Sequence, residues 1–319
     1  MRTTSLWIVA LLAGCALAGC AHAPRPALEG EAEEEVAAPP AGPPAGSTRR
    51  RPSIFVAPQA PPSFSAEARA RIARHCLHGL PRGSSGPPLG STDWVVRDGY
   101  VLQHSAFDKI ALFVCERVDA KNLDGTAARR DPFAPDPLLA KGRRAELSDY
   151  KRSGFSRGHQ APAANQRASQ ARNDETFFLS NMTPQLQALN GGIWERLEER
   201  VRDWAARFGT VWVLTGPMFY DPQEEDRMTA DGAVEYRVIG AGEVSVPTHY
   251  FKIVVREEGG ALKAAAFAFE HRKHPSGVDL AKHLVSIDWV EARTGLDFMP
   301  DLSPEQERGL ERSPGELWP

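Results

Sequence analysis

The sequence has few cysteines, and the four that it holds, Cys15, Cys20, Cys76 and Cys115, form no CxxC pair. A structural zinc site of the ribbon type needs such closely spaced thiolates, so this class of protein is excluded. No Walker loop and no GxGxxG motif appears along the chain. The sequence therefore contains no motif typical of NTP hydrolysis or of dinucleotide binding.

Basic residues are not in excess either. Lysine and arginine number 38 and aspartate and glutamate number 41, so the formal net charge is −3. This balance excludes a globally basic coat for nucleic acid, but it leaves room for a local basic cleft. Such a region exists at residues 151–173, which contain no acid and five basic residues: Lys151, Arg152, Arg157, Arg167 and Arg172. We expect this region to face an anionic partner, and a solvated basic loop is the alternative.

The apolar run nearest the amino terminus, Leu6–Leu12, is too short to cross a membrane. Arg2 precedes this run and small residues follow it, which is the order typical of a secretory signal. Two Leu-Ala-Gly-Cys tetrads, which end at Cys15 and Cys20, resemble the lipobox at which bacterial lipoprotein signals are cut. We therefore predict that residues 1–20 are a lipoprotein-type signal peptide, with an ordinary signal peptide as the alternative.

This leader predicts an exported cell-envelope lipoprotein. In a Gram-negative cell, the protein would lie in the periplasm or at the outer membrane. A lipid anchor on Cys20 is the predicted membrane contact. Residues 21–63 are rich in proline and alanine and lack apolar periodicity, which predicts a disordered linker more than a proline-rich ligand. Residues 64–319 then form one globular domain. In an oxidising compartment a disulfide between Cys76 and Cys115 is possible, but the sequence does not decide it.

The globular part predicts a mixed fold. Six segments rich in β-branched or aromatic residues and bounded by turn residues are expected as strands: Asp93–Arg97, Tyr100–Ser105, Ile110–Val118, Val211–Thr215, Tyr250–Val255 and Leu262–Phe269. Short turns between most neighbours favour antiparallel pairing. Apolar residues recur at spacings of three and four from Ile193 to Phe208, which predicts a helix that Gly209 ends. The fold class is therefore α+β, with a central, largely antiparallel sheet flanked by helices.

Polar motifs gather in the middle of the chain. Arg157 and His159 stand two residues apart, a spacing that puts both side chains on one face of an extended strand. Residues 180–185 read Ser-Asn-Met-Thr-Pro-Gln. The side-chain amides of Asn181 and Gln185 are costly in free energy to bury without hydrogen-bond partners. Asn190 precedes the long helix, and a helix cap with no further role is the alternative interpretation of this residue. Glu198 and Arg202 are i, i+4 neighbours on that helix.

Read together, these residues resemble the DNA/RNA non-specific endonucleases, the endonuclease G-like family with a ββα-metal active site. The match runs from about Tyr100 to Phe298. Its diagnostic blocks are residues 149–159 (DYKRSGFSRGH), 162–165 (PAAN), 178–185 (FLSNMTPQ) and 189–190 (LN), followed by Trp194, Glu198 and Arg202, with further blocks at 215–219 (TGPMF) and 294–298 (TGLDF). Several motifs in the right order are a more specific signal than any one of them.

The resemblance implies a Mg²⁺-dependent endonuclease, with Mn²⁺ as a substitute metal, that hydrolyses the phosphodiester bonds of DNA and also of RNA without sequence preference. His159 matches the general base, and Asn190 matches the single protein ligand of the metal. Glu198 matches the carboxylate that orients the water shell of the metal. Arg157 and Arg202 match arginines that bind phosphate, a contact that carries no base information.

Further residues are implied near the site. Asn181 and Gln185 match polar residues that are expected to bind substrate, and either Arg129 or Arg130 matches a further family arginine. Ser156 stands where many members carry aspartate, although a subset that includes exonuclease-like members carries serine. This difference leaves the balance of endonuclease and exonuclease activity open. A homodimer is also open, and no inhibitor partner is indicated.

Two alternatives compete with this interpretation. The first is a catalytically inactive protein of the same fold that binds nucleic acid or a partner in the envelope, although all the matched catalytic positions are filled. The second is a zinc hydrolase built on His271 and His274, which form an HxxH pair. The cations Arg272 and Lys273 between them oppose metal binding, so this pair is a weak candidate.

Overall fold

The computed structural model describes residues 47–52, 62–83, 90–225, 228 and 230–319. All of them belong to one compact unit, residues 40–319. The predicted signal peptide, residues 1–20, lies outside the described residues, as does most of the predicted linker, residues 21–63. Among the described residues, no helix combines the length and the apolar character needed to cross a bilayer.

A seven-stranded sheet forms the centre of the unit, and all of its strand pairs are antiparallel. Its strands, in spatial order, are β13 (Leu284–Val285), β12 (Ala261–Glu270), β11 (His249–Glu258), β8 (Thr210–Met218), β5 (Ala111–Asp119), β4 (Val101–Ser105) and β3 (Thr92–Val96). The six predicted strands correspond to β3, β4, β5, β8, β11 and β12, with ends shifted by a few residues. The prediction of an α+β fold with a largely antiparallel sheet is confirmed.

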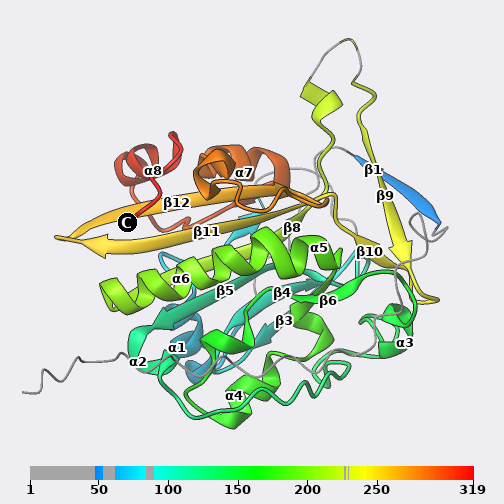
Figure 1. Ribbon diagram of the computed structural model, residues 1–319, viewed down its shortest axis with the longest axis horizontal. Helices are drawn as coiled ribbons and strands as arrows, with labels where there is room; N and C mark the ends of the chain where they lie inside the picture. Colours follow the sequence, from blue (N-terminus) through cyan, green and yellow to red (C-terminus); the bar gives the residue numbers. More distant parts are fainter. Residues whose placement is uncertain (1–46, 53–61, 84–89, 226–227, 229) are drawn as a thin grey trace, which may run out of the picture. The chain divides into compact units, whose positions relative to one another are not determined.

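The two faces of this sheet support two cores, because successive side chains of a strand point to opposite faces. On β11, Phe251 and Ile253 enter the core that contains helices α1 (Ala66–His75) and α7 (Ile287–Thr294). The alternate residues of β11 enter the core formed by α6 (Glu195–Phe208). Figure 1 shows α7 and α8 (Pro304–Glu311) on one side of β11 and β12, with α6 on the other. Apolar residues therefore cover both faces of the central strands.

The helix predicted for residues 193–208 is confirmed as α6, but it begins at Glu195. The preceding residues form the π-helical turn η3 (Asn190–Trp194), in which Gly191 and Gly192 leave helical geometry. Gly209 ends α6 with φ of +87°, a conformation that glycine adopts without a steric penalty. The kink places Asn190 at the start of a separate turn that leads into α6.

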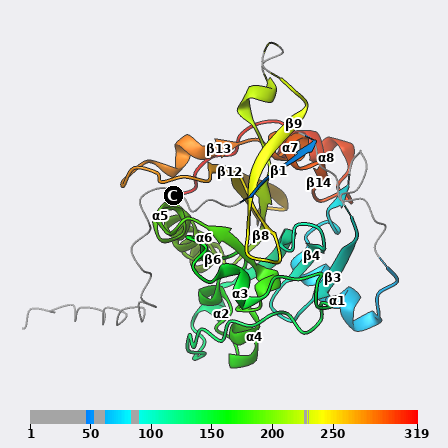
Figure 2. The ribbon, with the colours of Figure 1, turned by 90° about the vertical axis from the view of Figure 1, so that its right-hand side faces the viewer.

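Three small sheets lie outside the main one. They pair β1 (Thr48–Pro52) with β9 (Ala233–Ile239) and β10 (Val244–Val246), β14 (Leu296–Asp297) with β2 (Arg82–Gly83), and β6 (Ser156–His159) with β7 (Met182–Gln185). All of these pairs are antiparallel. Figures 1 and 2 show β1 alongside β9.

Strand β1 corrects the linker prediction for residues 48–52. The basic run Arg49–Arg51, within the predicted linker, is not a solvated tether, because each of its arginines binds an acid of the folded unit. Arg51 is buried, pairs with Asp108 and lies 3.5 Å from the ring centroid of Phe219. Arg49 pairs with Glu243, and Arg50 bonds Asp231. The folded unit therefore extends amino-terminal to residue 64.

The remaining elements are short, and most of them carry loops over the edges of the sheet. They are α2 (Ala120–Leu123), α3 (Leu147–Tyr150), η1 (Ala163–Asn165), α4 (Gln170–Glu175), η2 (Leu179–Asn181), α5 (Gln187–Leu189), η4 (Pro222–Glu225) and η5 (Leu280–His283). A disulfide joins Cys76, at the end of α1, to Cys115 on β5, with the Cα atoms 5.2 Å apart. The possible disulfide of the sequence is therefore present.

Candidate active site

Two strands and a helical turn converge around the predicted catalytic residues. β6 carries His159, β7 pairs with it, and the chain continues from β7 through α5 into η3, which begins with Asn190. β6, α5 and the beginning of α6 lie side by side in both views (Figures 1 and 2). Two antiparallel strands followed by a helix form the ββα arrangement that the resemblance implied.

His159 is only partly exposed, and its Nε2 atom is buried without a hydrogen-bond partner among the described residues. The ring centroid lies 4.9 Å from that of Phe177, in a T-shaped arrangement, and 6.1 Å from that of Phe133. Burial among these rings, together with the positive charges of Arg129 and Arg157, lowers the pKa of His159 to about 3. The imidazole is therefore neutral at pH 7 and can accept a proton.

Two guanidinium groups lie against the aromatic rings that pack around His159. The Arg157 guanidinium lies 4.0 Å from the ring centroid of Phe133, and that of Arg129 lies 5.4 Å from the ring centroid of Phe177. Arg130 instead bonds Asp174 of α4. Of the two arginines that the sequence left open, Arg129 is the one whose charge acts on His159.

Asn190 occupies the first position of η3, where its backbone N–H donates to Leu186 O at 2.9 Å. Its side chain is partly exposed and makes no hydrogen bond with the described residues. The alternative that Asn190 caps the helix through its side chain is not supported, since the backbone is already helical here. The amide oxygen is left available for a ligand.

The turn before Asn190 is held from two sides. On one side, the Ser156 hydroxyl donates to Gln187 Oε1 at 2.6 Å and so links β6 to α5. On the other, the His271 Nε2 accepts from Leu186 N at 2.7 Å, and the Nδ1 donates to Pro247 O at 2.8 Å. Because one ring nitrogen accepts and the other donates, the imidazole of His271 is neutral, with its proton on Nδ1.

Glu198 and Arg202 lie one helical turn apart on α6. Glu198 is partly buried, and its Oε1 has no hydrogen-bond partner among the described residues. Burial raises the pKa of this carboxyl, while the nearby charges of Lys252 and Arg202 favour its ionised form. Arg202 is partly exposed, so its guanidinium can meet solvent and Glu198 together. A carboxylate and a cation thus lie on the helix that follows the turn with Asn190.

Lys252 is a buried cation that sequence reasoning missed. It lies on β11, donates to Thr215 Oγ1 at 2.8 Å and sits 4.6 Å from the ring centroid of Trp194. The positive charge of Lys252 also favours the ionised form of a second buried acid, Glu116. The Glu116 carboxylate accepts hydrogen bonds from Asn165 at 3.0 Å and from Gln166 at 2.5 Å. A lysine within the apolar segment 250–255 was the signal that could have indicated this network.

The two amides predicted to bind substrate differ in their contacts. Asn181 is fully buried, donates to Ala161 O and Thr176 O at 2.9 and 2.8 Å, and accepts from Ala161 N at 3.0 Å. Its three polar contacts hold the backbone that follows β6. Gln185 is also buried, but neither its Nε2 nor its Oε1 has a partner among the described residues. Gln185 lies opposite Ser156 in the β6–β7 pair.

Two other motifs of the sequence do not form sites. Residues 154–158 match the spacing GxSxG, but Ser156 lies within strand β6 and not on a strand-to-helix turn, so it is not a nucleophile elbow. His271 and His274 do not converge on a metal: His271 bridges Leu186 and Pro247, whereas His274 Nε2 contacts Glu270 O at 3.0 Å. The alternative of a zinc hydrolase has no support in these contacts.

Comparison with known proteins agrees with this geometry. The family model described as DNA/RNA non-specific endonuclease matches residues 79–305. The chain is 37% identical to mitochondrial endonuclease G of Homo sapiens over 208 residues, which are 65% of this chain and 69% of the relative. It is 36% identical to the mitochondrial nuclease EXOG of Xenopus laevis over 229 residues, 70% of this chain and 63% of the relative.

A solved structure supports the fold. It is a crystal structure of the EndoG/EndoGI complex, whose title concerns the mechanism of EndoG inhibition. The matched chain has a TM-score of 0.64 and 30% sequence identity, and the match covers 78% of this chain and 96% of that chain. The fold is therefore that of a ββα-metal nuclease.

The comparisons also correct the predicted leader and location. The prediction of a signal peptide and an exported envelope lipoprotein with a lipid anchor on Cys20 is wrong, because several of the relatives are named mitochondrial nucleases. The physical reason lies in the composition: residues 1–28 contain basic residues, an apolar run and no acid. Secretory signals and acid-poor mitochondrial targeting segments share these features, so a short segment does not separate the two.

Proposed function

The chain belongs to the family of DNA/RNA non-specific endonucleases, and we propose that it hydrolyses phosphodiester bonds of DNA and RNA with Mg²⁺ as the metal. Mn²⁺ is the substitute that the same oxygen ligands accept. The observation that supports the proposal is the ββα junction, in which β6 carries the neutral His159 and the chain continues from its partner strand β7 through α5 to Asn190 at the start of η3. The nuclease domain comprises residues 64–319 together with β1.

The side chains fit a hard divalent cation. The amide oxygen of Asn190 is free of hydrogen bonds with described residues, and Glu198 Oε1 is buried without a partner. Mg²⁺ prefers oxygen ligands and keeps several waters, so one protein ligand with a nearby carboxylate suits it. When bound, the metal supplies charge stabilisation to the reacting phosphate. Asn190 is the proposed ligand, and Glu198 would orient water around it.

His159 is the proposed general base. Its unprotonated imidazole takes a proton from the attacking water, whose oxygen forms a bond to phosphorus while the bond from phosphorus to the leaving oxygen breaks. Arg157 and Arg202 stabilise the negative charge on the phosphate oxygens in the transition state, and Arg129 is a third candidate for this role. Because arginine contacts to phosphate read no base, we expect cleavage without sequence preference.

The amides receive separate roles. We assign to Asn181 the positioning of the chain after His159, since its Oδ1 and Nδ2 atoms already make three hydrogen bonds. Gln185 keeps the proposed role of a substrate contact, because its amide has no partner in the described part of the chain. Ser156 links β6 to Gln187, and we expect it to influence the balance of endonuclease and exonuclease activity. A homodimer also stays a prediction, for which sedimentation is the test.

The test is a nicking assay on supercoiled plasmid. Purified protein should nick the plasmid in Mg²⁺ and stop when the metal is chelated. His159→Ala should lower turnover by about 10²–10⁴ because the general base is lost, while plasmid binding persists through the arginines. His274→Ala is the matched control, since His274 contacts Glu270 O and the rings of Phe269 and His283, none of which has a proposed catalytic role.

Two outcomes would reject the proposal. Full activity in excess chelator would remove the metal from the reaction. A mobility shift of the plasmid without any nicking by the wild-type protein would favour the alternative, a catalytically inactive nucleic-acid-binding protein of the same fold.

A further inference from the structure

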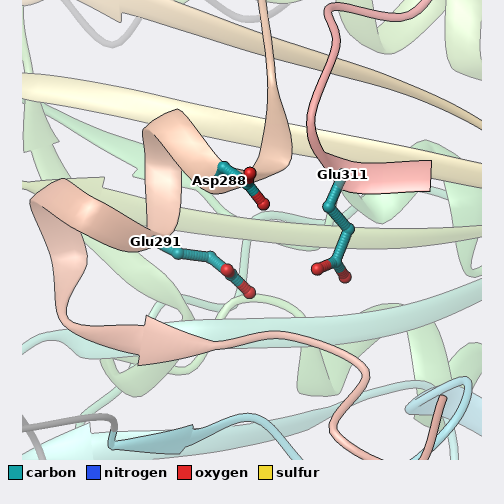
Figure 3. A group of neighbouring side chains, drawn as sticks. All are labelled: Asp288, Glu291 and Glu311. Atoms are coloured by element: carbon teal, nitrogen blue, oxygen red, sulfur yellow. The ribbon is translucent and has the colours of Figure 1, made fainter. Parts of the chain in front are cut away.

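Three carboxylates converge between α7 and α8, on the face of the main sheet opposite α6. They belong to Asp288 and Glu291 of α7 and to Glu311 of α8, and a ligand oxygen from each lies within 4.8 Å of the others. Figure 3 shows the three side chains pointing into the same space between the two helices. Like charges at this spacing repel one another, so the arrangement requires an explanation.

Glu311 makes the cluster unlike an ordinary acidic surface. Its residue is only 1% exposed, and both of its carboxylate oxygens are buried without a hydrogen-bond partner among the described residues. The charged groups that act most strongly on it are all carboxylates: Glu291, Glu307, Asp288 and Asp297. Burial and these charges raise the pKa of Glu311 to about 9. A buried carboxylate is normally paired or bound to a metal, and here no basic side chain supplies the pairing.

The two neighbours of Glu311 in the cluster are more exposed than Glu311 itself. Glu291 Oε1 accepts from Phe298 N at 2.7 Å, which fixes that side chain and leaves its second oxygen available. Asp288 is exposed, so water and ions reach the cluster past it. The nearest basic neighbour in sequence, Arg312, is exposed and forms no ion pair with described residues. The cluster thus combines one buried, one partly buried and one exposed carboxylate.

We propose that Asp288, Glu291 and Glu311 bind a divalent cation of the calcium type that joins α8 to α7. Ca²⁺ accepts carboxylates in one- or two-oxygen contacts and flexible geometry, and waters would complete its shell on the side of Asp288. Zn²⁺ is less suitable, because the cluster offers no nitrogen or sulfur ligand. The proposal does not rest on the proposed nuclease activity, since the residues lie on the other face of the sheet from Asn190.

The expected effect is stabilisation, because a cation that binds only the folded chain shifts the unfolding equilibrium. The experiment measures the Tm of the full-length protein without Mg²⁺, with and without CaCl₂, in an Asn190→Ala background that removes the proposed active-site ligand. We expect a saturable rise of about 2–4 °C, the order that one moderate binding event gives a chain of this size. Glu311→Gln should abolish the rise.

Matched variants separate the cluster from general charge effects. Glu305→Gln removes the same charge from an exposed position of α8 and should keep the full Ca²⁺ response. Asp288→Asn changes the exposed ligand and so preserves folding even if the buried variant does not fold. It should raise the Ca²⁺ concentration that gives half of the rise by roughly 10-fold.

Two results would overturn the proposal. If Ca²⁺ leaves the Tm unchanged while Glu311→Gln raises it, the carboxyls share protons and bind no cation. If Ca²⁺ raises the Tm equally in the parent, Asp288→Asn and Glu311→Gln proteins, the ion binds elsewhere.

Discussion

Arg202 is a residue whose proposed contact with a backbone phosphate can be tested directly. It is partly exposed on α6 and lies near the buried carboxyl of Glu198, so it offers a positive charge at the edge of the site. If it binds a backbone phosphate, Arg202→Ala should weaken binding of all duplex sequences alike and reduce the slope of log K against log salt by about 0.9, one contact's worth. The measurement is a salt series on several duplexes, with His159→Ala as background so that the substrate survives.

The control for this variant lies on the same helix. Arg200→Ala removes an equal charge from α6 two residues away, on a different side of the helix, and should leave the salt slope unchanged. If Arg202→Ala weakened only one duplex and kept the slope, Arg202 would read bases or serve only as the partner of Glu198. The phosphate role would then be withdrawn.

At the scale of elements, the position of η3 depends on His271, which joins Leu186 to Pro247 through both ring nitrogens. His271→Phe keeps an aromatic ring beside Phe155 and Tyr250 but removes both hydrogen bonds. We expect the Mg²⁺ concentration for half-maximal nicking to rise roughly 10-fold, the size typical of residues that support a metal ligand. His271→Gln should restore part of the loss, because its amide oxygen can accept from Leu186 N. A Mg²⁺ curve that stays unchanged while the Tm falls would show a purely structural role.

Elements defined by local pattern were predictable, and contacts between distant segments were not. Strands such as β11 and the helix α6 followed from apolar runs and periodicity, and the motifs predicted the catalytic residues by resemblance. The missed strand β1 depends on partners far along the chain, since Arg49 pairs with Glu243 and Arg51 with Asp108. In the sequence, an arginine run next to prolines has the composition of a linker. Only the folded chain places the acidic partners next to these arginines. The network of Lys252 and the carboxylate cluster of α7 and α8 were missed for the same reason.

For the whole molecule, buried ionisable groups predict how stability depends on pH. Burial lowers the pKa of His75, His104, His249 and His271 to about 4 and that of His159 to about 3. The unfolded chain therefore binds more protons than the folded chain between these values and about 6.5, so stability falls as the pH decreases through this range. Raised carboxyl pKa values, to about 7 for Glu291 and about 9 for Glu311, act in the opposite sense above about 4.5.

The two groups of residues together predict a maximum of the free energy of unfolding near pH 6.5. Below this pH the histidines of the unfolded chain take up protons that the buried histidines do not, and above it the raised carboxyls act in the opposite sense. Urea unfolding between pH 4 and 9 measures the profile.

His104 is the best single probe, because it is fully buried and neither ring nitrogen has a partner among the described residues. His104→Leu should reduce the slope between about pH 4 and 6.5 by about 1.4 kcal/mol per pH unit, the contribution of one proton. The control is His78→Leu, which removes a histidine whose side chain is not in the core. An unchanged slope in His104→Leu would mean that this histidine is not held neutral in the folded protein.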